Sequence, residues 1–223
     1  MQTIIVIPAY NEGRVIGEVV EEVRKRYPHV FVIDDGSADD TAARARAAGA
    51  VTFRHAVNRG QGAALQTGIT AALRAGADLI VTYDADGQMR PEDIDAVIAP
   101  VAAGACAVAL GSRFLGAGEG MPPLRRATLE AARAFTNLVT GLSLTDTHNG
   151  FRALSREAAS KIRLRCDRMA HASELLEEIA THALPYREVP VVVRYTEYSM
   201  RKGQKLTGAF RILRDLFISS WTR

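Results

Sequence analysis

The feature that most constrains the fold is an alternation, through the first half of the chain, of short β-branched runs with longer alanine-rich segments. Such runs suit strands buried on both faces, and the segments between them are long enough for crossover helices. This rhythm is typical of a parallel sheet covered by helices, so we expect an α/β fold with a Rossmann-like, mostly parallel sheet. The expected strands are Thr3–Ile7, Val30–Ile33, Val51–Arg54, Leu79–Tyr83 and Ala107–Leu110.

Helices are expected between these strands and over much of the second half. After Gly111 the rhythm changes to a mixed α/β pattern, with a Gly/Pro-rich loop at Gly116–Pro123 and a β-branched run at Val189–Arg194. The expected helices are Gly13–Arg26, Asp40–Ala48, Gly62–Ala75, Pro91–Ala102, Leu124–Val139, Ser173–His182 and Thr207–Trp221. The chain has 223 residues and no repeat or linker that divides it, so we expect a single domain over residues 1–223.

Basic residues concentrate at the C-terminal end. The last thirty residues, from Arg194, carry a net charge of +5, whereas the rest of the chain carries −2. This asymmetry favours contact of the tail with a diphosphate, a lipid phosphate or a membrane surface, and a solvated basic helix is the alternative. The overall charge of only +3, without interleaved aromatic and basic residues, argues against a nucleic-acid-binding protein.

Cysteine spacing and the longest apolar stretch indicate a location. Cys106 and Cys166 lack the spacing of a disulfide framework or a zinc site, and the N-terminus shows no signal peptide. The longest uncharged stretch, Ala96–Ser112, contains Pro100 and Gly104 and is shorter than the roughly twenty residues of a spanning helix. We therefore expect a cytoplasmic protein that does not cross a membrane. The oligomeric state stays open, a homodimer included.

Polar residues follow three of the expected strands, in the clusters Pro8–Glu12, Asp34–Ser37 and Asp84–Gln88. In an open α/β sheet, ligands bind beyond the carboxyl ends of the strands. We therefore expect the three clusters to converge on one edge of the sheet.

The stretch DADGQ is the most informative of these clusters. Asp84, Asp86 and Gln88 place two carboxylates and a side-chain carbonyl at alternate positions, which suits Mg²⁺ or Mn²⁺. Such an ion takes further ligands from substrate phosphates, which fits a nucleoside diphosphate as leaving group. The alternative is an Asx-rich turn that only ends a strand.

The other two clusters offer groups for a nucleoside. A carboxylate after the second strand, such as Asp35, can accept hydrogen bonds from a base or a ribose, whereas Asp39 or Asp40 is better explained as a helix cap. Tyr10 offers a ring for stacking and Glu12 a carboxylate for a hydroxyl, although a lone tyrosine is more often an ordinary half-buried aromatic.

Six motifs stand in the order found in family 2 glycosyltransferases: PAYNE, VIDDGSADDT, NRGQGAALQTG, YDADGQ, GSRF and DTHNGFR. The chain resembles this family over residues 3–205, and most of all its dolichol-phosphate mannose synthase-like branch. The resemblance implies the GT-A fold, with a nucleotide-sugar-binding half in residues 1–112 and an acceptor-side half in residues 113–223. It also implies an inverting reaction and a sugar donor carried on GDP or UDP.

The resemblance also assigns roles to individual positions. Those matched to the donor are Pro8, Tyr10, Glu12, Asp35 and Asp84, those matched to the metal are Asp84, Asp86 and Gln88, and those matched to catalysis and the acceptor side are Arg113, Asp146, Gly150 and Arg152.

One further segment resembles the family, and two positions depart from its pattern. The stretch Arg194–Gly203 is similar to the loop that closes over the donor diphosphate, and Arg194 and Lys202 are our candidates for its cations. The usual GKG is GQG here, with Gln61 in place of a cation expected near the donor. The usual DADLQ is DADGQ, which loosens the loop and removes no ligand.

These positions predict an in-line attack on the anomeric carbon, with charge stabilisation by the metal, Arg113 and the tail cations. A polyprenyl phosphate acceptor needs no general base. A saccharide hydroxyl, in surface polysaccharide or lipopolysaccharide synthesis, needs one, and Asp146 is the candidate. A catalytically silent nucleotide-sugar-binding protein is the alternative from another class. The amphipathic segment Thr207–Trp221 either docks on the inner face of the membrane or packs on the core of the protein.

Overall fold

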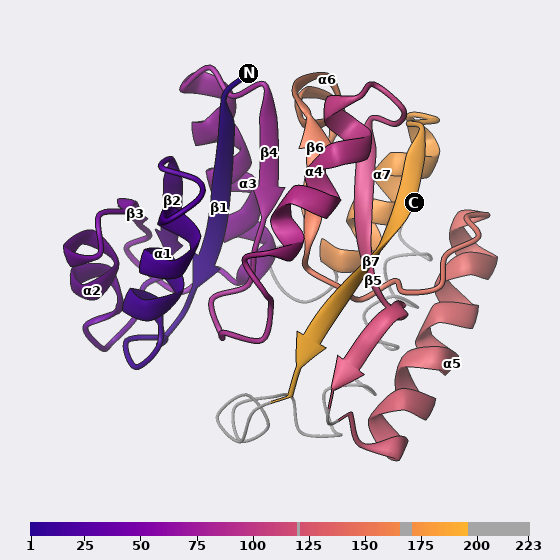
Figure 1. The fold of residues 1–223 in the computed structure, drawn as a ribbon, viewed down its shortest axis with the longest axis horizontal. Helices are drawn as coiled ribbons and strands as arrows, with labels where there is room; N and C mark the ends of the chain where they lie inside the picture. The colour runs from indigo at the N-terminus through magenta and orange to yellow at the C-terminus, as the bar shows by residue number, and fades with distance from the viewer. Residues whose placement is uncertain (120, 166–170, 196–223) are drawn as a thin grey trace.

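A seven-stranded sheet lies between two layers of helices in the computed structural model, which describes residues 1–119, 121–165 and 171–195 (Figure 1). The strand order is β3-β2-β1-β4-β6-β5-β7. β6 is antiparallel to both of its neighbours, and the other strand pairs of this sheet are parallel, so the predicted mostly parallel sheet is confirmed. The strands are β1 (Thr3–Ala9), β2 (Val30–Asp34), β3 (Val51–Arg54), β4 (Leu79–Thr82), β5 (Val108–Glu119), β6 (Arg152–Ser155) and β7 (Tyr186–Arg194).

The helices cover both faces of the sheet because successive strand residues point to opposite sides. On β1, Ile5 and Ile7 join the core beneath α1 (Ile16–Arg24), α2 (Thr41–Ala47) and α4 (Asp93–Ala102). Ile4 and Val6 join the core beneath α3 (Gln61–Arg74), α6 (Arg156–Lys161) and α7 (His171–Thr181). The long helix α5 (Pro123–Thr140) lies at the outer edge of the molecule and contacts α7 (Figure 1).

Strand β5 is longer than the sequence predicts. The stretch Gly116–Pro123 was expected to be a loop, but β5 continues to Glu119 and pairs again with β7, with Ala117 opposite Val192. A Cβ at Gly116 would lie 2.2 Å from the carbonyl oxygen of Val191, so the glycine permits the close approach of the two strands. The glycine-rich composition that indicated a loop is therefore a property of a strand pair.

The sequence reasoning missed β6 and α6 altogether. β6 is four residues long, RALS, and contains no β-branched residue, so nothing in its local pattern marks it as a strand. It pairs with both β4 and β5, with Arg152 opposite Thr82 and Leu110. Ser155 ends the strand and caps α6, since its Oγ accepts a hydrogen bond from the N–H of Ala158 at 3.1 Å.

Within the described ranges, no helix combines the length and the apolar character that crossing a bilayer requires. Cys106 is a buried free thiol. The predicted helix Thr207–Trp221, Cys166 and Lys202 lie outside the described residues.

The order of the strands brings the three polar clusters together. β2, β1 and β4 are neighbours and parallel, so their carboxyl ends meet at one edge. The N–H of Asp35 donates to the carbonyl of Ala9 at 2.8 Å, and that of Tyr83 donates to the carbonyl of Val6 at 2.9 Å. The residues that follow β1, β2 and β4 therefore share one edge, as predicted.

Candidate active site

The loop after β4 is fixed between its own buried tyrosine and the end of β7. Tyr83 is buried, and its hydroxyl donates to the carbonyl of Met89 at 2.6 Å, which closes the loop. Met89 forms an antiparallel bridge with Val193, and the N–H of Arg194 donates to the carbonyl of Gln88 at 2.9 Å. The predicted metal loop thus has a defined shape, despite the glycine that was expected to loosen it.

The carboxylate of Asp84, at the start of this loop, packs closely against Gly150. A Cβ on Gly150 would lie 2.6 Å from both carboxylate oxygens of Asp84, so only glycine leaves room for this carboxylate. The amide Nε2 of Gln61 donates to Oδ1 of Asp84 at 3.3 Å. The glycine of the DTHNGFR motif is therefore explained by its contact with the metal loop.

Burial raises the pKa values of both carboxyl groups of the metal loop. Burial raises the pKa of Asp84, and the guanidinium groups of Arg152 and Arg113 lower it in part. Burial, followed by the charge of Asp84, raises the pKa of Asp86 to about 7. Two carboxylates held together in this way form a place where a divalent cation would be strongly favoured.

The donor set fits Mg²⁺ or Mn²⁺. Asp86 and Gln88 share a tight turn, in which the N–H of Gln88 donates to Oδ1 of Asp86 at 3.0 Å. Mg²⁺ needs only one or two protein carboxylates, because it keeps waters and binds substrate phosphates. Among the described residues, no group of three or more His, Cys, Asp or Glu side chains gathers as a metal cluster.

Arg152 lies behind the metal loop rather than on an open surface. Its side chain on β6 is buried, and burial lowers its pKa to about 10, against the opposing charges of Asp84 and Asp146. Its Nη1 has no hydrogen-bond partner among the described residues. The arginine predicted for the acceptor side is thus placed as an internal counter-charge to two carboxylates.

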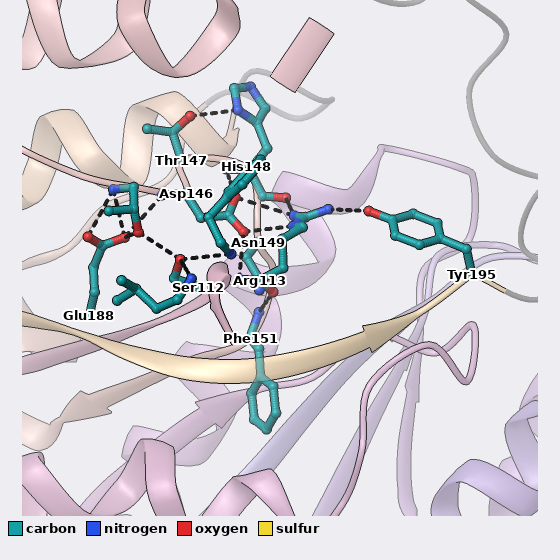
Figure 2. Close-up of polar contacts among 12 residues, drawn as sticks. Ser112, Arg113, Asp146, Thr147, His148, Asn149, Phe151, Glu188 and Tyr195 are labelled. Carbon is teal, nitrogen blue, oxygen red and sulfur yellow. Dashed lines mark hydrogen bonds and ion pairs between the residues drawn. The ribbon is translucent and has the colours of Figure 1, made fainter. Parts of the chain in front are cut away.

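Arg113 and Asp146 form a buried ion pair (Figure 2). Oδ2 of Asp146 accepts from the backbone N–H of Arg113 at 3.1 Å and from its Nε at 2.7 Å, and Oδ1 accepts from Nη2 at 3.4 Å. Arg113 also donates to the carbonyl of His148 and to the hydroxyl of Tyr195, each at 2.9 Å. These contacts fix the guanidinium in place.

Glu188 holds the turn that carries Asp146 (Figure 2). Its carboxylate accepts from the N–H of Thr145 at 2.9 Å, from the hydroxyl of Thr145 at 2.8 Å and from the N–H of Asp146 at 3.0 Å. Sequence reasoning missed Glu188, because a single glutamate in a strand carries no pattern that reveals its partners. Its role becomes visible only when β7 is placed beside the turn.

A pocket of about 290 Å³ opens beside the ion pair. Two of its lining residues are cationic, and Phe114 contributes an apolar wall over which the guanidinium of Arg126 lies, 5.9 Å from the ring centre. A site of this composition suits an anion attached to an apolar group. The lining residues are Arg113, Phe114, Gly116, Met121 and Arg126.

The residues after β1 divide into buried and exposed ones. Pro8 is buried in β1 opposite Ile33, so it shapes the end of the strand from inside. Tyr10 is 44% exposed and can offer its ring to a base. Glu12 is buried, its N–H donates to the hydroxyl of Thr41 at 2.8 Å, and its charge acts on the two metal-loop aspartates.

Asp35 organises the segment that precedes α3. Its carboxylate accepts from the N–H of Arg59 at 3.0 Å and from that of Gly60 at 2.6 Å. Nδ1 of His55 lies 2.7 Å from Oδ1 of Asp35, and Nε2 of His55 lies 3.0 Å from the hydroxyl of Thr67. Sequence reasoning missed His55, which stands three residues before the NRGQG motif and belongs to no spacing pattern of its own.

Only one of the two predicted tail cations can be located. Arg194 is exposed, and its Nε lies 3.4 Å from the carboxylate of Glu119. Its backbone is tied to the metal loop through Gln88, which brings the start of the tail to this edge of the sheet. Lys202 lies outside the described residues.

The sequence is similar to those of known glycosyltransferases. The family model described as Glycosyl transferase family 2 matches residues 4–163. MJ1222, an uncharacterised protein of Methanocaldococcus jannaschii, is 40% identical and covers 96% of this chain and 90% of its own length. The UDP-N-acetylglucosamine–dolichyl-phosphate N-acetylglucosaminyltransferase of Methanococcus voltae is 32% identical, with coverage of 96% and 94%.

A solved structure extends the likeness to the fold. Glucosyl-3-phosphoglycerate synthase from Mycobacterium tuberculosis, in complex with Mg²⁺ and UDP, matches with a TM-score of 0.75 over 96% of this chain and 78% of that chain. The sequences are only 19% identical, so this comparison bears on the fold alone. It confirms the predicted GT-A fold.

Proposed function

Because the chain belongs to glycosyl transferase family 2, we propose that it transfers a sugar from a nucleoside-diphosphate sugar to a polyprenyl phosphate. The reaction inverts the anomeric carbon and requires Mg²⁺ or Mn²⁺ at the donor. The observation that carries this proposal is the position of Arg113. It lines the cationic pocket and its charge also acts on Asp84, so it stands between an acceptor site and a donor site.

The donor is held at the carboxyl ends of β1, β2 and β4. Tyr10 stacks on the base, Glu12 and Asp35 hold the nucleoside side, and the metal loop holds the diphosphate. We propose a uridine nucleotide, supported by the printed name of the Methanococcus voltae relative, which specifies a UDP-linked sugar. A GDP-linked sugar is the competing donor. The sugar itself is left open.

The acceptor phosphate binds in the pocket beside Arg113. Arg113 and Arg126 supply charge for a phosphate, while Phe114 and Met121 supply apolar surface for the first part of a hydrocarbon chain. The same relative is named for transfer to dolichyl phosphate, which supports a lipid phosphate for this chain. A lipid acceptor also supports contact with a membrane surface, for which the segment Thr207–Trp221 is proposed.

The chemical step is a single displacement. An oxygen of the acceptor phosphate attacks the anomeric carbon, the bond from that carbon to the β-phosphate oxygen breaks, and the nucleoside diphosphate leaves with the bonding electrons. The phosphate is already an anionic nucleophile, so no general base is needed. Arg113 holds the attacking phosphate, and Asp146 acts by positioning Arg113. Asp146 would be the base for a hydroxyl acceptor.

Charge balance at the donor comes from the chain and from a cation. Asp84, Asp86 and Gln88 would hold a divalent metal, which would neutralise the charge that develops on the diphosphate. From behind the loop, Arg152 partly offsets the rise that burial causes in the pKa of Asp84, and Arg194 adds positive charge at the edge of the site. Lys202, in the tail, is proposed for the same role.

Transfer assays with purified protein test this function. The full chain is incubated with Mn²⁺, a labelled UDP- or GDP-sugar and either undecaprenyl phosphate or a saccharide acceptor, and labelled lipid is extracted. We expect transfer from a UDP-sugar to the lipid phosphate, and its loss in EDTA. Transfer to the saccharide alone would replace the acceptor, and nucleotide binding without turnover would indicate a sugar-nucleotide-binding protein.

A further inference from the structure

Gln61 reaches the metal loop from the first position of α3. Gly60, just before the helix, has a φ of 106°, and its N–H donates to Asp35 at 2.6 Å, so the turn into the helix is fixed. From this position the Nε2 of Gln61 donates to Oδ1 of Asp84 at 3.3 Å. The side chain is half-buried, so it borders both the carboxylate and the open part of the site.

Charged side chains also act on Asp84. The guanidinium groups of Arg152 and Arg113 attract its carboxylate, while the carboxylates of Glu12 and Asp86 repel it. Both arginines are buried, at 2% and 7% exposed, and are therefore parts of the interior. Gln61, at the start of α3, contributes a neutral amide. Because its side chain is only half-buried, a substitution there can change the charge near Asp84 without disturbing the core.

We propose that Gln61 is a positioning residue that orients Asp84 for the divalent cation and that its neutrality makes nucleotide binding depend on that cation. This inference rests on the proposed function. With an amide at position 61, this side chain adds no charge toward the diphosphate, so the balance of charge there depends more on the metal. The Nε2–H···Oδ1 bond also orients the carboxylate of Asp84, which would hold the metal.

Substitutions at position 61 should act on the metal through charge. An ammonium at the place of the amide would compete with the cation for Asp84 and repel it, whereas a carboxylate would attract it. At a few ångströms, and with the screening of a half-exposed position, one unit of charge changes metal affinity by roughly tenfold. The opposite signs expected for lysine and glutamate separate charge from a general disturbance of the fold.

The experiment titrates Mn²⁺ into the full chain without nucleotide and follows free Mn²⁺ by electron paramagnetic resonance. Gln61→Lys, Gln61→Glu and Gln61→Met are compared with the wild type, and Arg74→Gln changes a charge at the exposed far end of the same helix. We expect about tenfold weaker binding for lysine, tighter binding for glutamate and several-fold weaker binding for methionine. Arg74→Gln should match the wild type.

UDP binding in EDTA gives the second readout. Gln61→Lys should gain measurable metal-independent affinity for UDP, and the wild type should show none. If lysine and glutamate shift Mn²⁺ affinity in the same direction, or leave it unchanged, the role of Gln61 is overturned. If the Mn²⁺ affinities of the wild type and the variants follow the expected order of charge, but the wild type transfers no sugar, only the proposed function is overturned.

Discussion

Asp86 is the metal-loop carboxylate whose removal should separate chemistry from folding. It is part of the turn that contains Gln88 and does not belong to the hydrophobic core. Asp86→Ala should reduce turnover by about a hundredfold or more, because a catalytic cation contributes several kcal/mol to stabilisation of the transition state. Circular dichroism and turnover of the purified variant check this, with the exposed Glu18→Ala as control. Unchanged turnover would contradict the proposed mechanism.

Gly150 provides a sharper test of the metal site, because this glycine acts only by leaving room for the carboxylate of Asp84. A methyl group there would lie 2.6 Å from both oxygens of Asp84, so Gly150→Ala must displace the carboxylate. We expect loss of Mn²⁺ binding and of activity. Gly17→Ala is the matched control, since a Cβ at Gly17 meets nothing within 4 Å. It should keep activity and gain up to about 1 kcal/mol of stability from helix propensity. Full Mn²⁺ affinity in Gly150→Ala would show that Asp84 is not a ligand.

At this scale the sequence indicates the proposed metal ligands better than the groups that hold them. Asp84, Asp86 and Gln88 are predictable because alternate positions in one loop carry their own geometry. His55 and Glu188 act through hydrogen bonds to residues 20 and 43 positions away. Only the folded chain brings such partners together, so no local pattern could have indicated them.

Among the elements, β1, β2 and β4 were predictable and β6 was not, for a physical reason. Strands buried on both faces consist of apolar runs such as IIVI and LIVT, which are visible in the sequence. β6 is buried as well, but it is short and begins with a charged residue, Arg152, whose place is set by Asp84 and Asp146. An element built around a functional charge departs from the pattern of its class.

The contact of β7 with the turn at 145–146 should contribute measurably to stability. Glu188→Gln removes the negative charge and puts an NH₂ group, which cannot accept, in place of one of the two oxygens that face the N–H groups of Thr145 and Asp146. We expect a loss of about 1–3 kcal/mol, the usual cost of leaving a buried donor unsatisfied, and weaker acceptor binding because Arg113 follows the turn. Urea unfolding and the KM for the lipid phosphate measure the two effects.

The exposed pair of Glu157 and Lys161 supplies the control for that measurement. Glu157→Gln removes a surface ion pair and should change the free energy of unfolding by less than about 0.5 kcal/mol. Equal stabilities of the two variants would mean that the Glu188 contacts do not contribute. A stability loss in Glu188→Gln with an unchanged KM would assign Glu188 to folding only.

The same turn should make stability depend on pH through His148. Burial is the main cause that lowers the pKa of His148, Arg113 and Arg152 lower it further, and Asp146 opposes them. The unfolded chain therefore binds the proton more readily, and stability falls as the pH drops below about 6.5. His148→Asn, measured by thermal unfolding from pH 7.5 to 5, should flatten this decline.

Exposed His29 provides the comparison for the pH experiment. His29→Asn should leave the slope of Tm against pH as it is in the wild type. If stability still falls with pH in His148→Asn as it does in the wild type, then groups other than His148 cause the fall. His148 would then be accessible to protons in the folded protein.

Over the whole molecule, the site depends on contributions from both halves of the chain. Asp84 follows β4 in the first half, whereas Arg152 on β6 and Arg113 on β5 belong to the second. The antiparallel β6 lies between β4 and β5 and brings the two arginines to the aspartate. The motif order predicted these neighbours through the family resemblance, but the sheet order that makes them neighbours could not be derived from local pattern.

Because the proposed donor site spans β1, β2 and β4, its occupation should stabilise the fold as a unit. A ligand at a hundred times its Kd adds about 2.7 kcal/mol to the free energy of unfolding. For a chain of this size that raises Tm by roughly 5–10 °C. We expect this rise with UDP and Mn²⁺ together, a smaller one with GDP and Mn²⁺, and almost none for either nucleotide in EDTA. Differential scanning fluorimetry measures all four conditions on one preparation. An equal rise for UDP in EDTA would mean that the diphosphate is held by protein cations, and the cation at Asp84 would lose its proposed role.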